Sequence, residues 1–532
     1  MKRPTLKNKG FILPTVISYM LVLSIIMIFS IEIIESNIEV VGNGIKSQEA
    51  FYIAEAGINY YLWHLSHNPA DYKDGQSTPT TPNPTLGYGP YVHTYYDNNE
   101  INQGSYTLWI NPQGNGSTIV NVESIGKANG SSTTRTIVAQ IGSPSYASYA
   151  VSSNSALWFG STETADGPVL SNQGVRMDGP NTDTISSANT TYVPSNELGG
   201  DGNSHPGVWC SLSVTSPVNC ATRNTSDWVY PVASLNFNNI TSSLCSLKKI
   251  AFLSNSSTSS LASQTNACSL TPTNLTNAYL PQRSTSGSYS LTKGYLIQLD
   301  PNGTYDLYDV NGENDTLSPY TSALTLQLVA SGVSIPSSGV IFAEDNVWVR
   351  SNPTFHGRVT IGSGRLANSN DNGDIVIADN LLYSTKNGAD AIGLVAQDSV
   401  VVAPYAPPAS GSFNYEIDGD LIAETGEVWY PDTYRSNPNA CTIGWTNSNQ
   451  TLTFYGSIAE NQTWTWGWVD GTSSCGDAVL DKNGDEFNGD YFSGFEFDTT
   501  EYDYNSLYTP PPSFPITSTY NILSWREVLK VP

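Results

Sequence analysis

The sequence predicts a mainly β protein that carries one long helix at its amino terminus. Residues 11–31 contain no charged side chain, and a helical pattern of apolar residues continues from there to Leu62. Beyond this point, short apolar runs alternate with turns, in a chain that contains 44 Gly and 31 Pro. Short apolar runs bounded by turn residues are typical of β-strands. These observations together predict the fold class.

The composition of the 532-residue chain limits its partners and its environment. It has 22 Lys and Arg against 47 Asp and Glu, a formal charge of −25. Nucleic-acid binding needs a basic face, so this balance argues against it. Hydrophobic residues make up 39% of the chain, which is enough for a large core. Few charges and many turn residues favour an extracellular β protein.

The first helix is predicted over residues 11–62. Its apolar run of 21 residues is long enough to span a bilayer. Four basic residues and no acidic residue lie within the first ten positions. This asymmetry predicts that the amino terminus stays in the cytoplasm and that the rest is exported. A signal peptide would have a shorter apolar run followed by a small-residue cleavage site. We therefore expect a single-pass anchor in the cytoplasmic membrane.

The amino-terminal sequence resembles a type IV prepilin. A basic leader of residues 1–10 ends in Gly10, Phe11 follows, and the apolar helix begins there. The stretch QEAFYIAEAG at 48–57 is similar to the same segment of PilX-like minor pilins. The resemblance implies that a prepilin peptidase cuts between Gly10 and Phe11. It also implies contacts with other pilins through the helix.

Thr15 departs from the pattern of the major pilins, which carry glutamate at this position. In that family the carboxylate pairs with the amino terminus of the neighbouring subunit. Tip pseudopilins and many PilX-like proteins also lack this glutamate. The resemblance therefore implies a tip or priming subunit with an adhesive head. One alternative is a membrane-tethered surface adhesin that joins no filament. A second alternative is a glycan-active enzyme.

A stripe of small residues lies near the end of the predicted helix. Ala50, Ala54 and Gly57 share one helical face, and small residues permit close packing. The stripe predicts either docking of the helix onto its own head or contacts with other subunits, and both are compatible.

Residues 63–104 are predicted to form a connector, and residues 105–143 a β-meander packed on the helix. The meander should contain three strands with alternating apolar residues, separated by Gly-rich turns. His64 and His67 are three residues apart, but no cysteine or acidic cluster completes a metal site. They are expected to supply polarity at an interface.

The remainder of the chain is predicted to form a large β-rich head. Residues 144–336 are expected to be irregular and β-rich, with disulfides. Residues 337–532 are expected to form a solenoid-like head, because Val340, Val359, Ile375 and Ile392 recur every 16–19 residues. Such spacing suits a solenoid in which each coil contributes two or three strands. A β-sandwich is the alternative.

Six cysteines favour disulfides over a metal site, because none of them forms a CxxC pair. Pairing of sequence neighbours would close three short loops, and free buried thiols are the alternative. The predicted pairs are Cys210–Cys220, Cys245–Cys268 and Cys441–Cys475.

Alternating tryptophans suggest one binding surface in the head. Trp464, Trp466 and Trp468 would face one side of a strand. An exposed row could stack on sugar rings or on another protein. The alternative is a place in the core beside Cys475.

Two acidic loops have the alternating oxygen ligands that calcium prefers. Acidic loops with Asn and Gly are also ordinary turns, which is the alternative. Calcium is the one cofactor that the sequence suggests. The first loop contains Asp481, Asn483, Asp485, Asn488 and Asp490, and the second contains Asp309, Asn311, Glu313 and Asp315.

Enzyme chemistry has little support in the sequence. Hydrolysis of glycosides needs a pair of carboxylates, and no spacing in this chain singles out such a pair. The sequence also lacks the GxSxG, HExxH and phosphate-loop motifs. We therefore expect a protein that is not an enzyme.

Overall fold

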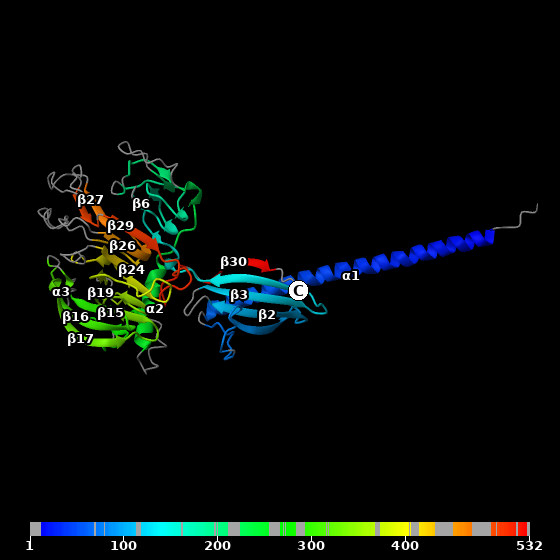
Figure 1. The fold of residues 1–532 in the computed structure, drawn as a ribbon, viewed down its shortest axis with the longest axis horizontal. Coiled ribbons are helices and arrows are strands. Elements are labelled where there is room, and N and C mark those ends of the chain that lie inside the picture. The colour runs from blue at the N-terminus through cyan, green and yellow to red at the C-terminus, as the bar shows by residue number, and fades with distance from the viewer. Residues whose placement is uncertain are drawn as a thin grey trace, which may run out of the picture. The chain divides into compact units, whose positions relative to one another are not determined.

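The structure, a computed structural model, divides the chain into two compact units (Figure 1). The first, which we call the helix–sheet unit, comprises residues 1–112, 120–142 and 520–532. The second, which we call the head, comprises residues 113–119 and 143–519. The described residues are 12–68, 71–78, 80–112, 119–160, 163–195, 198, 200–210, 224–254, 267–269, 271, 273–283, 293–314, 317, 319–367, 373–403, 405, 414–430, 451–470, 491–495, 497–517 and 520–528.

The helix–sheet unit consists of one helix and a five-stranded sheet. Helix α1 spans Ile12–His67, and its second half packs on the sheet around a shared hydrophobic core. The strand order is β1-β2-β3-β4-β30. Pairs β1–β2, β2–β3 and β4–β30 are antiparallel. The strands are β1 (Tyr88–Tyr96), β2 (Asn102–Pro112), β3 (Ile119–Ala128), β4 (Thr134–Gly142) and β30 (Asn521–Val528).

The three predicted meander strands are confirmed as β2, β3 and β4, but the sheet has two further strands. β1 lies inside the segment predicted as a connector, residues 63–104. Pro90 made this segment resemble a loop, although β1 is an edge strand, where proline is tolerated. β30 comes from the segment predicted as solenoid, residues 337–532, and closes the opposite edge of the sheet.

The head is built on two sheets through which the chain passes alternately. Strands of the first sheet pair in parallel, as do those of the second from β15 to β25. Each circuit therefore adds one strand to each sheet, and we call it a rung. The first sheet contains β18 (Val340–Ala343), β20 (Arg358–Ser363), β22 (Ala391–Ala396), β24 (Asn414–Ala423) and β26 (Thr451–Glu460), and the second contains β19 (Asn346–Ser351), β21 (Ile375–Ile377), β23 (Val400–Val402) and β25 (Val428–Trp429).

The solenoid-like head is thus present, but the predicted repeat length was wrong. Val340 lies opposite Thr360, and Arg358 lies opposite Ala391, which are separations of 20 and 33 residues. Ile375 belongs to the second sheet. The four anchors had been counted as one series, whereas Val340, Val359 and Ile392 belong to the first sheet and Ile375 to the second, and the loops between the strands vary in length.

The segment 144–336, predicted to be irregular and β-rich, contributes strands to the same large sheet. The order in that sheet is β13-β9-β7-β5-β26-β24-β22-β20-β18-β14. The chain therefore enters the sheet in its middle at β5, extends to one end, and resumes at the other end with β14. The added strands are β5 (Val151–Ser153), β7 (Val169–Ser171), β9 (Ile185–Ser187), β13 (Trp228–Val229) and β14 (Tyr279–Leu280).

Helix α2 (Asn239–Leu253) connects the two ends of this sheet. Its apolar face, with Ile240, Leu244 and Leu247, shares a core with Phe342 and Val395 of the sheet. Side chains of a strand alternate between its two faces, so these sheet residues point away from the core between the two sheets. The helix covers a face that would otherwise be exposed and apolar.

Smaller elements complete the head. A parallel sheet of β6 (Leu157–Phe159), β8 (Val175–Met177) and β12 (Val208–Trp209) lies in the lobe labelled β6 in Figure 1. β15, β16 and β17 extend the second sheet. The remaining elements are β10 (Thr191–Tyr192), β11 (His205–Pro206), β15 (Gly294–Asp300), β16 (Thr304–Glu313), β17 (Leu324–Ser334), β27 (Gly467–Asp470), β28 (Tyr491–Gly494), β29 (Phe497–Tyr502), α3 (Tyr320–Ala323), and 3-10 turns at Tyr146–Ser148, Thr225–Asp227 and Ala267–Ser269.

Candidate functional site

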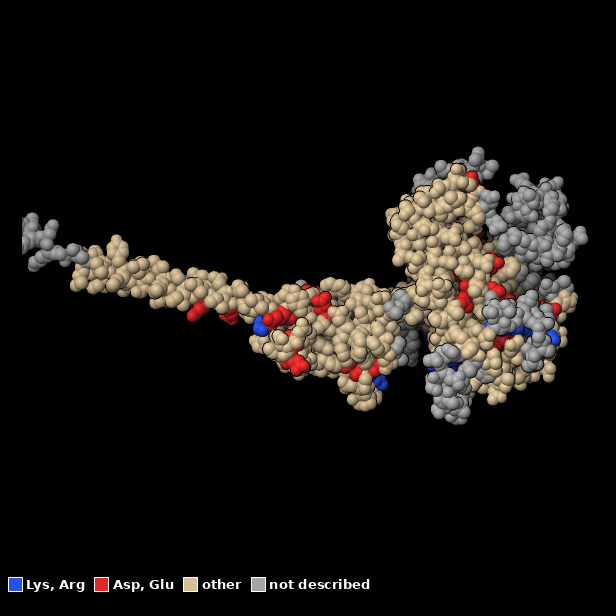
Figure 2. All heavy atoms as spheres, turned by 180° about the vertical axis from the view of Figure 1, so that it is seen from behind, with Lys and Arg blue, Asp and Glu red and all other residues tan. Residues whose placement is uncertain are grey.

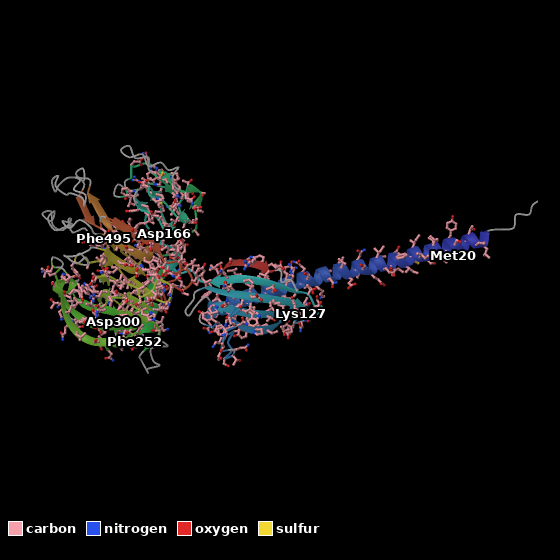
Figure 3. All side chains as sticks on the ribbon, in the orientation of Figure 1. Met20, Lys127, Asp166, Phe252, Asp300 and Phe495 are labelled. Carbon is pink, nitrogen blue, oxygen red and sulfur yellow. A yellow bond between two sulfur atoms is a disulfide. The ribbon has the colours of Figure 1, made fainter. Side chains whose placement is uncertain are left out.

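The first half of α1 is an exposed apolar rod. Within the described residues, α1 is the one helix long and apolar enough to cross a membrane, and none of its most apolar window, of mean hydropathy 2.4, is buried. Its first charged residue is Glu32, so the uncharged part that begins at Ile12 is about 30 Å long. That length matches the hydrocarbon core of a bilayer. Figure 2 shows this part without charge, and Figure 3 shows Met20 projecting from it.

The three serine hydroxyls on this rod are satisfied within the helix. Three serines donate hydrogen bonds to the carbonyl oxygen four residues earlier. Such bonds remove the cost of placing a hydroxyl in lipid. Thr15 lies in the same exposed part of the helix, whereas Gly10 and Phe11 lie outside the described residues. The bonds join Ser18 to Pro14, Ser24 to Met20 and Ser30 to Ile26, at 2.8–2.9 Å.

The small-residue stripe docks the second half of α1 onto its own sheet. Ala50 and Ala54 are fully buried. A Cβ atom on Gly126 of β3 would lie 2.1 Å from the carbonyl oxygen of Ala50 and 2.4 Å from the amide nitrogen of Ala54. A Cβ atom on Gly57 would lie 2.3 Å from Oγ of Ser124. Helix and sheet approach this closely only because both positions are glycine, which confirms the docking interpretation.

A polar network ties the loop after α1 to the helix. The Tyr60 hydroxyl donates to Oδ1 of Asp74 at 2.9 Å, and Nε2 of His93 lies 2.7 Å from Oδ2 of Asp74. His64 contacts Oδ2 of Asp71 at 3.2 Å. Burial and the Asp74 carboxylate raise the pKa of Tyr60. The predicted interface role of His64 therefore fits, and no cluster of three metal-ligating side chains occurs among the described residues.

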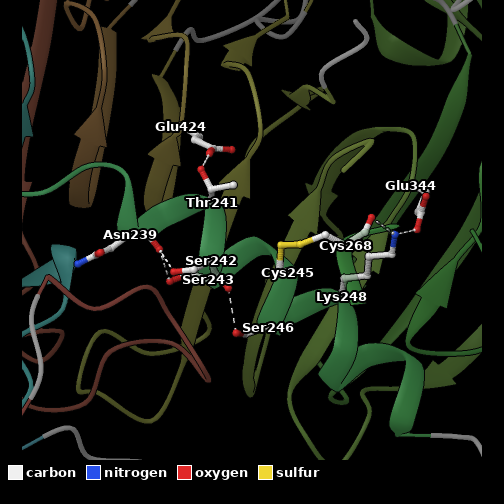
Figure 4. The surroundings of a disulfide bond; sticks show 10 residues. All are labelled: Asn239, Thr241, Ser242, Ser243, Cys245, Ser246, Lys248, Cys268, Glu344 and Glu424. Carbon is white, nitrogen blue, oxygen red and sulfur yellow. Dashed lines mark hydrogen bonds and ion pairs between the residues drawn. A yellow bond between two sulfur atoms is a disulfide. The ribbon is translucent and has the colours of Figure 1, made fainter. Parts of the chain in front are cut away.

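One predicted disulfide is confirmed, and it closes a loop beside a buried ion pair (Figure 4). Cys245 of α2 is bonded to Cys268, with their Cα atoms 5.1 Å apart. Lys248 lies one turn further along α2, forms an ion pair with Glu344, and donates to the carbonyl oxygen of Cys268 at 3.3 Å. Burial raises the pKa of Glu344, and Lys248 opposes that effect. Cys210 is also disulfide-bonded, whereas Cys220, Cys441 and Cys475 lie outside the described residues.

The tryptophan row does not form a surface. Trp464 and Trp466 are 8% and 3% exposed and belong to the main core. Their rings meet edge to face, 6.1 Å apart. They precede β27, so strand alternation does not place them on one outer face. The core interpretation holds for both residues, while the side chain of Trp468 lies outside the described atoms.

Three side chains of the second acidic loop have partners within the protein. Asp309 forms an ion pair with Arg283 at 3.1 Å, and Asn311 accepts a hydrogen bond from the same guanidinium. Glu313 accepts a hydrogen bond from Trp348 Nε1 at 3.0 Å. These side chains lie on β16, whose pairing with β17 shifts register between Val310 and Glu313. Asp315 lies outside the described residues, as do the residues of the first loop, Asp481, Asn483, Asp485, Asn488 and Asp490.

Buried carboxylates in the head were not predicted from the sequence. Asp420 is fully buried and accepts hydrogen bonds from the hydroxyls of Ser457 and Ser506, at 2.7 and 2.8 Å. Burial, together with the nearby Asp503, raises the pKa of Asp420 to about 7. An acid whose pKa is raised on folding stabilises the fold below its unfolded pKa, and this stability is lost as pH rises through 7. The head should therefore be more stable at pH 5 than at pH 8.

Comparisons with known proteins identify no family. No family model matches the sequence, and no curated protein matches it. One match among solved structures is the competence-associated pilin ComZ from Thermus thermophilus, at 12% sequence identity and a TM-score of 0.27. The match covers 91% of this chain and 98% of that chain. This degree of similarity does not establish a shared fold or function.

Proposed function

We propose that this chain is a minor pilin or pseudopilin that anchors in the cytoplasmic membrane and displays its head outside the cell. The observation that carries the proposal is the contrast between the two ends of α1. Residues 12–31 are apolar and exposed over about 30 Å, whereas Ala50, Ala54, Ile58 and Leu65 toward the other end are buried against an antiparallel sheet of the same chain. Such a helix is fixed to the protein at one end and offers the other to lipid or to neighbouring helices.

The direction of insertion and the processing step complete this proposal. Four basic residues lie in the first ten positions, which favours a cytoplasmic amino terminus. The Cys245–Cys268 disulfide fits an exported head, because disulfides persist in oxidising compartments. A prepilin peptidase would cut between Gly10 and Phe11. Other pilins would then contact the apolar half of α1.

We further propose a place at or near the filament tip. Thr15 cannot supply the carboxylate that would pair with the amino terminus of a subunit above it. A buried charge without its partner is costly in lipid, so a subunit lacking the carboxylate fits best where no subunit lies above. Each filament should then carry about one copy. Labelled heads spaced along the whole filament would contradict this placement.

Shearing filaments from cells separates this proposal from a membrane-tethered adhesin. We expect the chain in the sheared fraction together with the major pilin, and Gly10→Val should remove it from that fraction. Gly10→Ala is the matched control, because the peptidase of the resembled family accepts a small residue before the cut. If the wild-type chain stays with the cells while the major pilin is sheared off, the tethered adhesin is correct.

We propose display rather than catalysis as the role of the head. The buried carboxyl group of Asp420 is held by two serine hydroxyls, and Asp418 is held by the Tyr383 amide and by Lys386. Carboxyl groups with these roles support the fold. Incubation of the purified chain with polysaccharides should release no product, and release that depends on a head carboxylate would favour a glycan-active enzyme.

A further inference from the structure

Four planar groups form a continuous stack on the small parallel sheet of the head. Trp158 of β6, Arg176 of β8 and Trp209 of β12 occupy the same register position on neighbouring strands. The guanidinium carbon of Arg176 lies 4.5 Å from the ring centre of Trp158 and 5.5 Å from that of Trp209. His205 stacks on Trp209, with ring centres 3.5 Å apart and planes 10° from parallel.

Buried partners fix this stack in place. Asp178, which is 4% exposed, forms an ion pair with Nε of Arg176 at 2.7 Å and accepts a hydrogen bond from Nε1 of Trp158 at 3.0 Å. Nε1 of Trp209 donates to the Tyr192 hydroxyl at 2.9 Å. Each indole is thus held both by a ring contact and by a hydrogen bond. A ligand would meet a surface whose side chains lose little further freedom on binding.

Trp158 is the open end of the stack. Its side chain is 38% exposed, and no other tryptophan in the described part of the head is as exposed. Trp209 lies between Arg176 and His205, so both of its faces are in contact. A single, rigid indole is therefore available to a partner on this lobe.

The charges around Trp158 favour a neutral partner. Arg176 and Asp178 compensate one another, so the stack carries no net charge from this pair. A second cation over the indole would be repelled by Arg176 on the other side of the ring. The half-exposed carboxylate of Asp201 lies 2.8 Å from Nε2 of His205 at the other end of the stack, which disfavours an anionic ligand. Because Arg176 disfavours a cationic one, the surroundings of Trp158 match a neutral ligand best.

We propose that Trp158 is the stacking platform of a binding site for a neutral polysaccharide. A pyranose ring offers a flat face of weakly positive C–H groups, which fits the negative face of an indole, and it brings no charge. This site rests on the proposed display role of the head and gives the displayed head a ligand class. Binding itself does not depend on cleavage after Gly10 or on assembly into a filament.

Direct titration of the full chain, purified in detergent, tests the site. The probes are cellohexaose, chitohexaose and maltohexaose, with polygalacturonate as a charged comparison. We expect at least one neutral probe to bind and Trp158→Ala to weaken that binding by about tenfold or more. Trp158→Phe should retain part of the affinity. Trp525→Ala is the matched control, because Trp525 is a 59% exposed tryptophan of the helix–sheet unit, and it should leave binding unchanged.

Several results would overturn the site. These are the absence of binding to any neutral probe, binding to polygalacturonate alone, or equal affinity of the wild type and Trp158→Ala. If Trp158→Ala does not fold, as judged by thermal unfolding, equal affinity of Trp158→Phe and the wild type contradicts the proposal. Recovery of the chain in sheared filaments is measured separately. Failure of binding and failure of the pilin role are therefore distinguishable.

Discussion

Gly126→Ala should weaken the packing of α1 on its sheet. The added Cβ atom would lie 2.1 Å from the carbonyl oxygen of Ala50, and 2.4 and 3.0 Å from the amide nitrogen and Cα of Ala54. All three atoms belong to the helix backbone, which cannot move aside as a flexible side chain would. The helix must shift as a body, although Ala50, Ile53 and Ala54 are at most 1% exposed against the sheet.

The expected cost follows from overpacking. Inserting a methyl group into a packed core typically costs about 1–3 kcal/mol of stability. Because the added methyl group meets only backbone atoms, we expect a cost near the upper end of that range. A loss of about 3 kcal/mol corresponds to an opening equilibrium about 100-fold more favourable. Amide groups of residues 50–65 should therefore exchange with deuterated water about 100-fold faster when exchange follows opening of this interface.

Hydrogen exchange followed by mass spectrometry of the full chain in detergent measures this effect. Gly44→Ala is the matched control, because no heavy atom lies within 4 Å of its added Cβ, and exchange over 50–65 should stay as in the wild type. Peptides of the head should also be unchanged in both variants. Wild-type protection over 50–65 in Gly126→Ala would refute the packing argument.

The remaining predictions concern the head. Because burial raises the pKa of Asp420 from 3.8 to about 7, Asp420→Asn should stabilise the head by a few kcal/mol at pH 8 and by much less at pH 5, as thermal unfolding at the two pH values will show. An equal change at both would contradict the raised pKa. Lys248→Met should destabilise the head by about 3–5 kcal/mol, because the buried carboxylate of Glu344 loses its ion-pair partner and keeps the hydrogen bond from the Tyr279 hydroxyl. Adding Glu344→Gln should restore part of the loss, and no rescue would exclude the ion pair as its cause. Replacing Cys245 and Cys268 by serine should cost about 3 kcal/mol in chemical unfolding without reductant, whereas reductant should bring the wild type close to the variant.

Local patterns predicted much of the fold. The helix, the three central meander strands and the solenoid-like character of the head each depend on residues close in sequence, such as the alternation of Leu108 and Ile110 in β2. β30 was missed because its partner β4 lies almost 400 residues away, and no local pattern records such a pairing. β1 was missed because Gly89 and Pro90 are turn residues in most contexts, and only an edge position accommodates them in a strand.

Candidate surfaces were harder to predict than elements. Trp464 and Trp466 alternate as an exposed row would, but the chain there is not a strand and both rings enter the core. Trp158 was overlooked because Arg176 and Trp209, the next members of its stack, are 18 and 51 residues away and join it only through the pairing of β6, β8 and β12. Burial of Asp420 likewise depends on Ser457 and Ser506 of distant segments.

The mass of the mature amino terminus tests the anchored pilin proposal most directly. The chain is isolated from cells that contain an active prepilin peptidase, and its amino-terminal peptide is analysed by mass spectrometry. We predict a peptide that begins at Phe11 with a methylated amino group, and an uncut amino terminus in Gly10→Val. A wild-type chain that still begins at Met1 in these cells would contradict the proposal.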